Sequence, residues 1–315
     1  MMLLPRSERL RGCDANHQNR IIEPISQNAE RRLRKDMTKT YELRPGQSIE
    51  LLKELHIVTC DGKMNQDSRR KLKQIYHLFQ FIEPLLLESL AGREEIVLVD
   101  HGAGKSYLGF LLYDLFFKES AKRGRIWGIE TRDELVTRAT ELARRLGFTG
   151  MSFLNLSVMD SIVSESLPNQ VDIVTALHAC DTATDDAIQF ALAKRAKHIV
   201  LVPCCQAEVA GHLRMNKNKA LSKSALSELW RHPLHTREFG SLLTNVLRCL
   251  QLESHGYHVN VTELVGWEHS MKNELIIATY RDSPRDRAQK RLAELLDCIG
   301  GEDLASRFLS PRTSL

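Results

Sequence analysis

The sequence has no long hydrophobic run. No apolar stretch approaches the roughly 20 residues that a helix needs to cross a bilayer. Residues 1–6 lack the apolar core of a secretory signal peptide. We therefore expect a protein without a membrane-spanning segment or a cleaved leader. Internal repeats and low-complexity tracts are also missing, which excludes repeat architectures.

The chain also lacks a strong charge of one sign. Its formal net charge is +4, with 27% charged and 43% hydrophobic residues, which is ordinary for a globular protein. This balance permits nucleic-acid binding without arguing for it. The seven cysteines are an odd number and show no disulfide-framework spacing. We infer a reducing compartment and expect a cytoplasmic protein.

A glycine turn between an apolar run and an amphipathic segment is the most informative motif. Residues 96–99 are apolar and end at Asp100, Gly102 and Gly104 follow, and residues 108–117 have the pattern of a helix. A strand, a Gly-x-Gly turn and a helix form the nucleotide-binding start of a doubly wound α/β domain. The glycines let the backbone approach a ligand where a Cβ would collide with it.

The same stretch permits a P-loop interpretation. Gly104, Lys105 and Ser106 match the end of Gly-x-x-x-x-Gly-Lys-Ser/Thr. That motif needs its first glycine at position 99, where this chain has Val99 inside the expected strand. No second apolar strand ends in a clear magnesium-binding acid. A nucleotide hydrolase is therefore the less favoured alternative.

Apolar segments alternate with helical patterns along the rest of the chain. This alternation predicts a parallel sheet. The last two strands have no helix-length segment between them, so we expect them to close the sheet as an antiparallel hairpin. The expected strands cover residues 96–100, 125–130, 151–156, 171–177, 197–202, 257–264 and 275–280.

Helical patterns flank this sheet at both ends. Ser48 is the expected cap of a short helix, and residues 68–90 carry an apolar stripe. A helix over residues 284–298 follows the last strand. We divide the chain into a poorly ordered basic segment (1–40), a helical appendage beside the cofactor cleft (41–92), a catalytic domain (93–281) and a helical tail (282–315).

The ordered motifs over residues 70–281 resemble class I S-adenosylmethionine (SAM)-dependent methyltransferases. The resemblance is strongest to methyltransferase-domain proteins with Asp-x-Gly-x-Gly-Lys, His-x-Cys after the fourth strand and Pro-Cys-Cys after the fifth. The pattern at 177–185 also resembles tRNA ribose 2′-O-methyltransferases of a Cys-Cys-His type, although Gln206 stands where those enzymes carry His. The resemblance implies an α/β fold, a seven-stranded Rossmann-like sheet with a closing hairpin and an N-terminal helical appendage.

The resemblance also implies where SAM binds. Asp100 ends the first strand and can meet the cationic methionine end, while Glu130 ends the second and takes the ribose hydroxyls. The loop over residues 157–160 lies beside the adenine, where Asp160 can instead cap the next helix. The expected cofactor-binding residues are Asp100, Gly102, Ala103, Gly104, Lys105, Glu130, Val158, Met159, Leu177 and His178.

Three residues at the ends of the fourth and fifth strands are candidates for catalysis: His178, Asp181 and Cys205. His178 or Asp181 can act as a base that removes the acceptor's proton. The structural alternatives are a hydrogen-bonded loop histidine and an aspartate that caps the helix over 182–193. Cys180, Cys204 and Cys205 lack a Cys-x-x-Cys loop, so we expect no metal site.

The acceptor is left open by the sequence. RNA is favoured because Arg69, Lys73, Lys217 and Lys219 can neutralise phosphates at the cleft opening. A solvated helix face is the alternative for these residues. A protein or small-molecule acceptor, or a SAM-binding module without catalysis, remains an alternative function.

Overall fold

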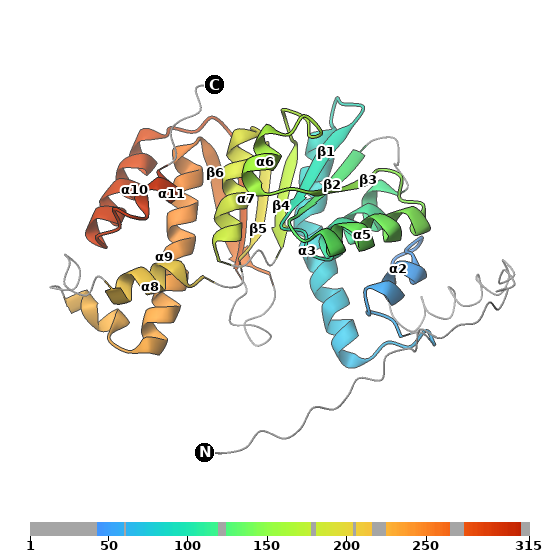
Figure 1. Cartoon of the computed structure of the whole chain (residues 1–315), viewed down its shortest axis with the longest axis horizontal. Helices are drawn as coiled ribbons and strands as arrows, with labels where there is room; N and C mark the ends of the chain where they lie inside the picture. Colours follow the sequence, from blue (N-terminus) through green and yellow to red (C-terminus); the bar gives the residue numbers. More distant parts are fainter. Residues whose placement is uncertain are drawn as a thin grey trace, which may run out of the picture. The chain divides into compact units, whose positions relative to one another are not determined.

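The computed structural model describes residues 43–59, 61–118, 124–177, 181–203, 206–215, 225–264 and 274–309. The chain forms two compact units, residues 1–45 and 46–315. The first unit lies almost wholly outside the described residues, as does the expected segment 1–40. The second unit holds the sheet and all the helices described below (Figure 1).

A seven-stranded sheet forms the centre of the second unit. Its strand order is β3-β2-β1-β4-β5-β7-β6, with β1 to β5 parallel and β7 antiparallel to both neighbours. The predicted α/β class and the closing hairpin are therefore confirmed. The strands are β1 (Ile96–His101), β2 (Gly124–Glu130), β3 (Met151–Asn155), β4 (Ile173–Leu177), β5 (His198–Val202), β6 (Tyr257–Glu263) and β7 (Glu274–Tyr280).

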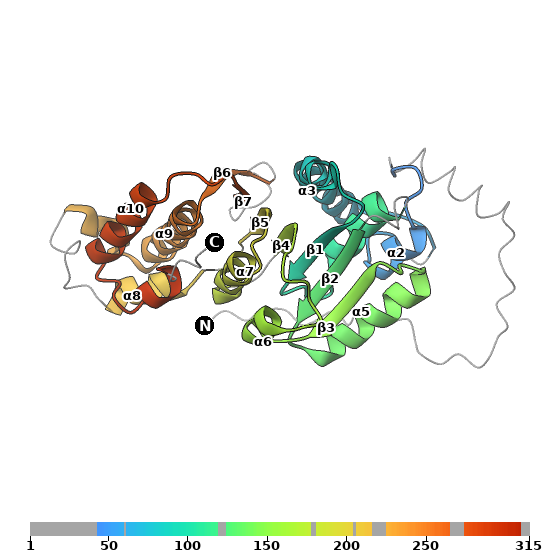
Figure 2. The ribbon, with the colours of Figure 1, turned by 90° about the horizontal axis from the view of Figure 1, so that it is seen from above.

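Helices cover both faces of this sheet, because parallel strands expose apolar side chains on each side. Seen from above, α3 and α5 lie on one face and α7 and α9 on the other (Figure 2). The helices are α2 (Ile49–Glu54), α3 (Gln66–Leu90), α4 (Tyr107–Leu112), α5 (Asp133–Leu146), α6 (Val158–Val163), α7 (Thr182–Ala193), α8 (Glu208–Met215), α9 (Pro233–Ser254), α10 (Asp286–Cys298) and α11 (Ala305–Phe308).

β1 lies where the sheet reverses its order of connection. It pairs with β2 on one side, through Asp100 and Gly128, and with β4 on the other, through Asp100 and Thr175. Open α/β sheets bind ligands at such a switch point, beyond the carboxyl ends of the strands. The loop that follows His101 therefore stands at the expected ligand edge.

The predicted helix over residues 108–117 is present and consists of two parts. α4 ends at Leu112 and continues as a π-helix, Tyr113–Phe117. Such insertions widen the helical turn by one residue. The turn buries Asp114, whose carboxylate accepts the backbone N–H of Ser48 at 2.9 and 3.1 Å. The first residues of the helical appendage are thus attached to the helix that follows the glycine turn.

Capping residues set the start of both appendage helices. Ser48 Oγ accepts the N–H of Leu51, as predicted. α3 begins at Gln66, two residues before the predicted start, because Asn65 Oδ1 accepts the N–H of Ser68. Both are side-chain N-caps, which satisfy a backbone donor that the helix leaves unpaired.

The C-terminal helices form a second apolar cluster. α9, a 22-residue helix that the sequence patterns did not predict, begins with Pro233 at its first turn. Its buried residues Leu243, Leu247 and Leu250 pack with residues of α8, α10 and α11. Among the described residues, no helix is both long and apolar enough to cross a membrane.

Removing the Asp114 carboxylate tests the attachment of α2. Asp114→Ala deletes the acceptor for Ser48 N–H and the partner of Lys118 in a buried setting. Hydrogen bonds to charged groups contribute about 1.5–3 kcal/mol, so we expect the free energy of unfolding to fall by that order. Urea unfolding measures it, with Lys118→Ala as the control that keeps the Ser48 contact. Equal stability of Asp114→Ala and wild type would contradict the attachment.

Candidate active site

The glycine turn adopts the backbone conformation that the motif predicts. Gly102 and Gly104 have φ of 65° and 58°, in the left-handed region that favours glycine. Ala103 N–H donates to Ile129 O at 2.9 Å, which ties the turn to β2. Ser106, with φ of 50°, precedes α4. The turn is therefore held by the end of the second strand as well as the first.

Asp100 is buried under this turn, with 2% of its surface exposed. Thr175 Oγ1 donates to its Oδ1 at 2.8 Å and Ser106 Oγ donates to its Oδ2 at 3.2 Å. Burial raises the pKa of Asp100 to about 6, against the opposing effect of these hydrogen bonds. The carboxylate thus joins β1, β4 and the start of α4 and still lines the pocket described below.

Glu130 ends β2 beside the turn. Its Oε2 accepts the N–H of Gly104 at 2.8 Å. Arg132 donates to both carboxylate oxygens, through Nε at 3.0 Å and Nη2 at 3.2 Å. Burial opposes ionisation, but the bonds from Arg132 and Gly104 outweigh it and hold the pKa of Glu130 below its ordinary value. Glu130 is therefore an ionised acceptor at the end of the second strand.

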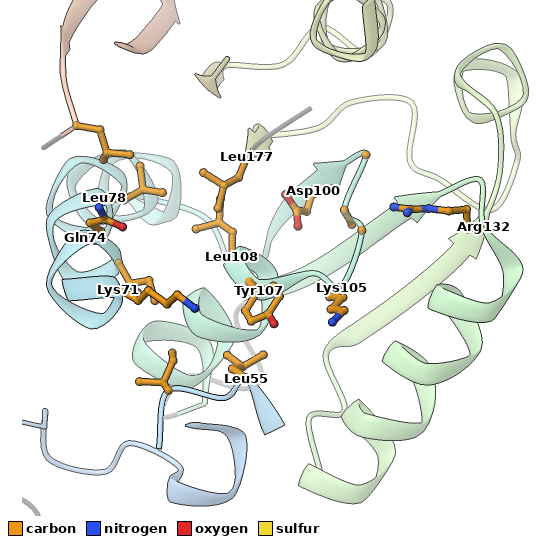
Figure 3. Close-up of a pocket in the computed structure, with 16 residues that line it drawn as sticks. Leu55, Lys71, Gln74, Leu78, Asp100, Lys105, Tyr107, Leu108, Arg132 and Leu177 are labelled. Atoms are coloured by element: carbon orange, nitrogen blue, oxygen red, sulfur yellow. The ribbon is translucent and has the colours of Figure 1, made fainter. Parts of the chain in front are cut away.

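A pocket of about 530 Å³ opens at this edge of the sheet (Figure 3). Its volume lies in the range typical of small-molecule sites. One wall is the glycine turn with the start of α4, and the facing wall comes from α3 and from Leu55 and Ile57, which follow α2 (Figure 3). The lining residues are Leu55, Ile57, Lys71, Gln74, Ile75, Leu78, Asp100, Gly102, Ala103, Gly104, Lys105, Tyr107, Leu108, Arg132, Leu177 and Leu264.

Six of the predicted cofactor residues line this pocket: Asp100, Gly102, Ala103, Gly104, Lys105 and Leu177. Glu130 contacts the turn but does not line the pocket. Its partner Arg132 does line it. Val158 and Met159 begin α6 and do not line it; the Met159 side chain is 64% exposed. Ser157, rather than Asp160, caps that helix.

Asp181 has a structural partner in this structure. Its Oδ1 accepts the N–H groups of Ala207 at 3.0 Å and Glu208 at 3.3 Å, which begin α8. The capping alternative named the wrong helix, because the side chain makes no capping bond to α7. The carboxylate therefore joins the segments that follow β4 and β5.

Several predicted residues lie outside the described residues. They are His178, Cys180, Cys204 and Cys205, together with Lys217 and Lys219. The roles predicted for them in catalysis, cofactor binding and RNA binding stay predictions.

α3 contributes pocket residues that the sequence patterns did not assign to a ligand site. Lys71, Gln74, Ile75 and Leu78 are spaced as one helical face and line the pocket. Arg69 and Lys73 are exposed but do not line it; each is two residues from Lys71, or roughly 200° around the helix. Ile75 and Leu78 were expected in the apolar stripe, and only the placement of α3 shows that this stripe borders a pocket.

His101 follows Asp100 and is also buried. Its ring packs near Phe190 of α7, with centroids 5.4 Å apart. Among the described residues, neither ring nitrogen has a hydrogen-bond partner. Burial lowers the pKa of His101 to about 4, so the ring is neutral at physiological pH. It contributes no positive charge to the pocket.

A buried ion pair between α9 and α7 lies next to the segments that follow β4 and β5. Arg248 of α9 is fully buried and donates Nε and Nη2 to Asp185 at 2.7 and 2.8 Å. Its Nη2 also reaches the backbone oxygen of Asp181 at 2.8 Å. Asn245 accepts from Arg248 Nη1 and from Gln206, which connects this pair to the segment after β5.

Neutralising Asp185 tests this support. Asp185→Asn leaves the Arg248 guanidinium buried without its charge partner, which costs about 3–5 kcal/mol. We expect urea unfolding to show a loss of that order. The double variant Asp185→Leu with Arg248→Met removes both charges and should recover much of the loss. A single variant within about 0.5 kcal/mol of wild type would refute the assigned role.

A comparison with protein families matches the part of the chain that contains the glycine turn. The family model of a methyltransferase domain matches residues 70–212. A glutathione S-transferase C-terminal domain-containing protein of Bos taurus is 26% identical over 234 residues, which are 69% of this chain and 34% of that protein. The chain therefore spans about a third of the length of the curated relatives it matches.

Two solved structures are also similar. A putative caffeoyl-CoA O-methyltransferase from Staphylococcus aureus aligns with a TM-score of 0.44 and 11% identity, over 80% of this chain and 99% of that one. An rRNA methylase from Streptococcus thermophilus aligns with a TM-score of 0.38 and 11% identity, over 62% and 92%. The family model's stretch, residues 70–212, contains the glycine turn and β1 to β5.

Proposed function

We propose that this chain binds S-adenosylmethionine and transfers its methyl group to an acceptor. The observation that carries the proposal is the contact between the glycine turn and the acid-ended second strand, Gly104 N–H to Glu130 at 2.8 Å. It places a backbone that a ligand can approach beside a carboxylate that can accept ribose hydroxyl groups. The methyltransferase-domain match over residues 70–212 supports the same reaction class.

The residues present fit such a cofactor. Gly102 and Gly104 leave the turn without side chains, and Glu130 stays ionised. Asp100 is the acid that lines the pocket beyond the turn, and its carboxylate can meet a positive charge. Leu108 and Leu177 offer apolar contact nearby. The site therefore offers a carboxylate at the end of each of two strands, with a glycine backbone between them.

The bound cofactor supplies an electrophilic methyl group, and the protein has to align the acceptor with it. Alignment of the reacting atoms is the main source of rate enhancement in such a displacement. Aliphatic side chains after α2, on α3 and at the end of β4 line part of the pocket, and such a lining limits the access of water to the reacting atoms. For an acceptor that carries a proton, we propose His178 as the base; the Asp181 carboxylate already accepts two backbone N–H groups.

The acceptor class we propose is RNA, held through phosphates by Arg69, Lys73, Lys217 and Lys219. Arg69 and Lys73 are exposed on α3, which supports contact with a backbone outside the pocket. Residues 177–185 and 203–205 carry the finer resemblance, to the branch with His-x-Cys and Pro-Cys-Cys. Transfer of labelled methyl groups from SAM to RNA, protein or small-molecule fractions of a cell extract distinguishes the acceptor classes, and no transfer to any fraction favours a binding module.

Cofactor binding gives the first test. S-adenosylhomocysteine at about tenfold above its dissociation constant should stabilise the protein by about 1.4 kcal/mol, while Mg-ATP should not. Glu130→Ala should weaken this binding by about 1.5–3 kcal/mol, because a charged acceptor for the ribose is lost. Isothermal titration calorimetry measures the affinity, and circular dichroism confirms that the variant is folded. Stabilisation by Mg-ATP alone would overturn the proposal.

Binding should also depend on pH through Asp100. A cationic ligand favours the ionised carboxylate, and the pKa of Asp100 is raised to about 6 in the free protein. SAM affinity should therefore be constant above pH 7. Below pH 6 it should fall by up to tenfold per pH unit, because Asp100 of the free protein takes up a proton that has to leave before the cation binds. His101 stays neutral in this window, since its pKa is about 4. Titration calorimetry from pH 5 to 7 checks this, and Asp100→Asn should flatten the dependence. The same slope in that variant would assign the proton to another group.

A further inference from the structure

Lys71 is the charged residue that α3 contributes to the pocket. It shares a helical face with Gln74, Ile75 and Leu78, all of which line the same wall. Figure 3 shows its side chain extending from α3 toward Tyr107. The other lining residues of α3 and of the segment after α2 are aliphatic or neutral, so Lys71 is the one cation that the described residues of this wall contribute.

Lys105 comes to the same pocket from the opposite wall. It belongs to the glycine turn, two residues before Tyr107, the first residue of α4. In the view of Figure 3, Tyr107 lies between the two lysines. Its hydroxyl is drawn at about the same height as their amino groups. Two ammonium groups and a phenol hydroxyl therefore line this pocket as hydrogen-bond donors.

The charges of the pocket do not cancel among the described residues. Its charged lining residues are Lys71, Asp100, Lys105 and Arg132. Arg132 is paired with Glu130, and Asp100 is hydrogen-bonded to Ser106 and Thr175. Within the described part of the chain, neither lysine has an ion pair or side-chain hydrogen bond. Like charges that share a partly enclosed site repel each other, and an anion between them removes this repulsion.

Lys71 also lies apart from Glu130, the proposed ribose acceptor. Figure 3 places Arg132, the partner of Glu130, and Lys71 on opposite sides of Asp100 and the glycine turn. A ligand whose ribose contacts Glu130 and whose chain follows the turn past Asp100 then points its far end toward α3. The cationic end of the pocket is thus the place for a negative group remote from the ribose.

We propose that Lys71 and Lys105, with the Tyr107 hydroxyl, form a subsite for an oxyanion, a carboxylate or a phosphate. The proposal rests on the proposed function for the orientation of the ligand, and it assigns to α3 a binding role outside the sheet. The oxyanion has two sources of the same chemistry: the amino-acid end of the cofactor or an anionic group of the acceptor. Charge-assisted hydrogen bonds to a lysine are the interaction that both share.

The test compares wild type with Lys71→Met, which keeps most of the side-chain length and removes the charge. Lys290→Met is the matched control, because Lys290 is an exposed lysine of α10. Three probes are titrated by calorimetry: S-adenosylhomocysteine, 5′-methylthioadenosine, which lacks the carboxylate, and inorganic phosphate. Lys105→Met should act in the same direction as Lys71→Met, and Lys71→Arg should restore binding.

If the oxyanion belongs to the cofactor, Lys71→Met should weaken S-adenosylhomocysteine binding about tenfold and leave 5′-methylthioadenosine binding unchanged. If it belongs to the acceptor, both nucleosides should bind as in wild type, and phosphate should bind wild type but not Lys71→Met. Either result supports the subsite and names its source.

Equal binding of all three probes by Lys71→Met and Lys290→Met would overturn the subsite. Failure of the proposed function looks different: wild type would then bind neither nucleoside, and the phosphate titration alone would decide whether the lysines hold an anion. Because Lys71 is exposed, both variants should keep the wild-type unfolding midpoint, which separates lost binding from lost folding.

Discussion

The buried carboxylate of Asp100 is the constraint on which the site depends. One oxygen is bound by Thr175 of β4 and the other by Ser106 at the start of α4. A buried acid without partners would cost several kcal/mol, so these hydrogen bonds keep the strand end, its neighbour and the following helix together. The glycine turn lies between Asp100 and Ser106 and is therefore held at both ends. The same burial raises the pKa of Asp100 to about 6, so the carboxyl is mostly ionised at pH 7 and becomes mostly neutral below pH 6.

The pocket is completed by residues that come before the sheet in the chain. α3 and the segment that follows α2 supply the wall that faces the glycine turn, and Asp114 binds the backbone of Ser48, the N-cap of α2. The π-helix that buries Asp114 directly follows α4, so one helix carries both the turn and the attachment of the facing wall. Both walls are therefore connected to this helix. A change at the start of α2, where Ser48 binds Asp114, is expected to alter the pocket without any contact with the glycine turn.

The far side of the sheet has its own buried polar support. Arg248 brings the guanidinium of α9 against Asp185 and the backbone of Asp181, while Asp181 caps α8. Fully buried charges are retained only where they are paired and hydrogen-bonded, and here the pairing joins the segments after β4 and β5. These two segments flank the residues predicted to act on the acceptor. The helical C-terminal region is therefore part of what positions the ligand edge.

The sequence by itself determined the features that depend on near neighbours. The strands, the glycine turn, the acid at the end of β2 and the closing hairpin follow from apolar runs, turn residues and the spacing between successive segments, which are local features of the chain. The tertiary structure alone decided which side chains meet. It placed Lys71 rather than Arg69 or Lys73 at the pocket. It also directed the Asp181 carboxylate to the start of α8, where the sequence had suggested a cap on α7. Arg248 of α9, a helix that was not predicted, is buried. These contacts join residues far apart in the chain, and the direction of a helix face or a carboxylate toward a distant element leaves no local pattern.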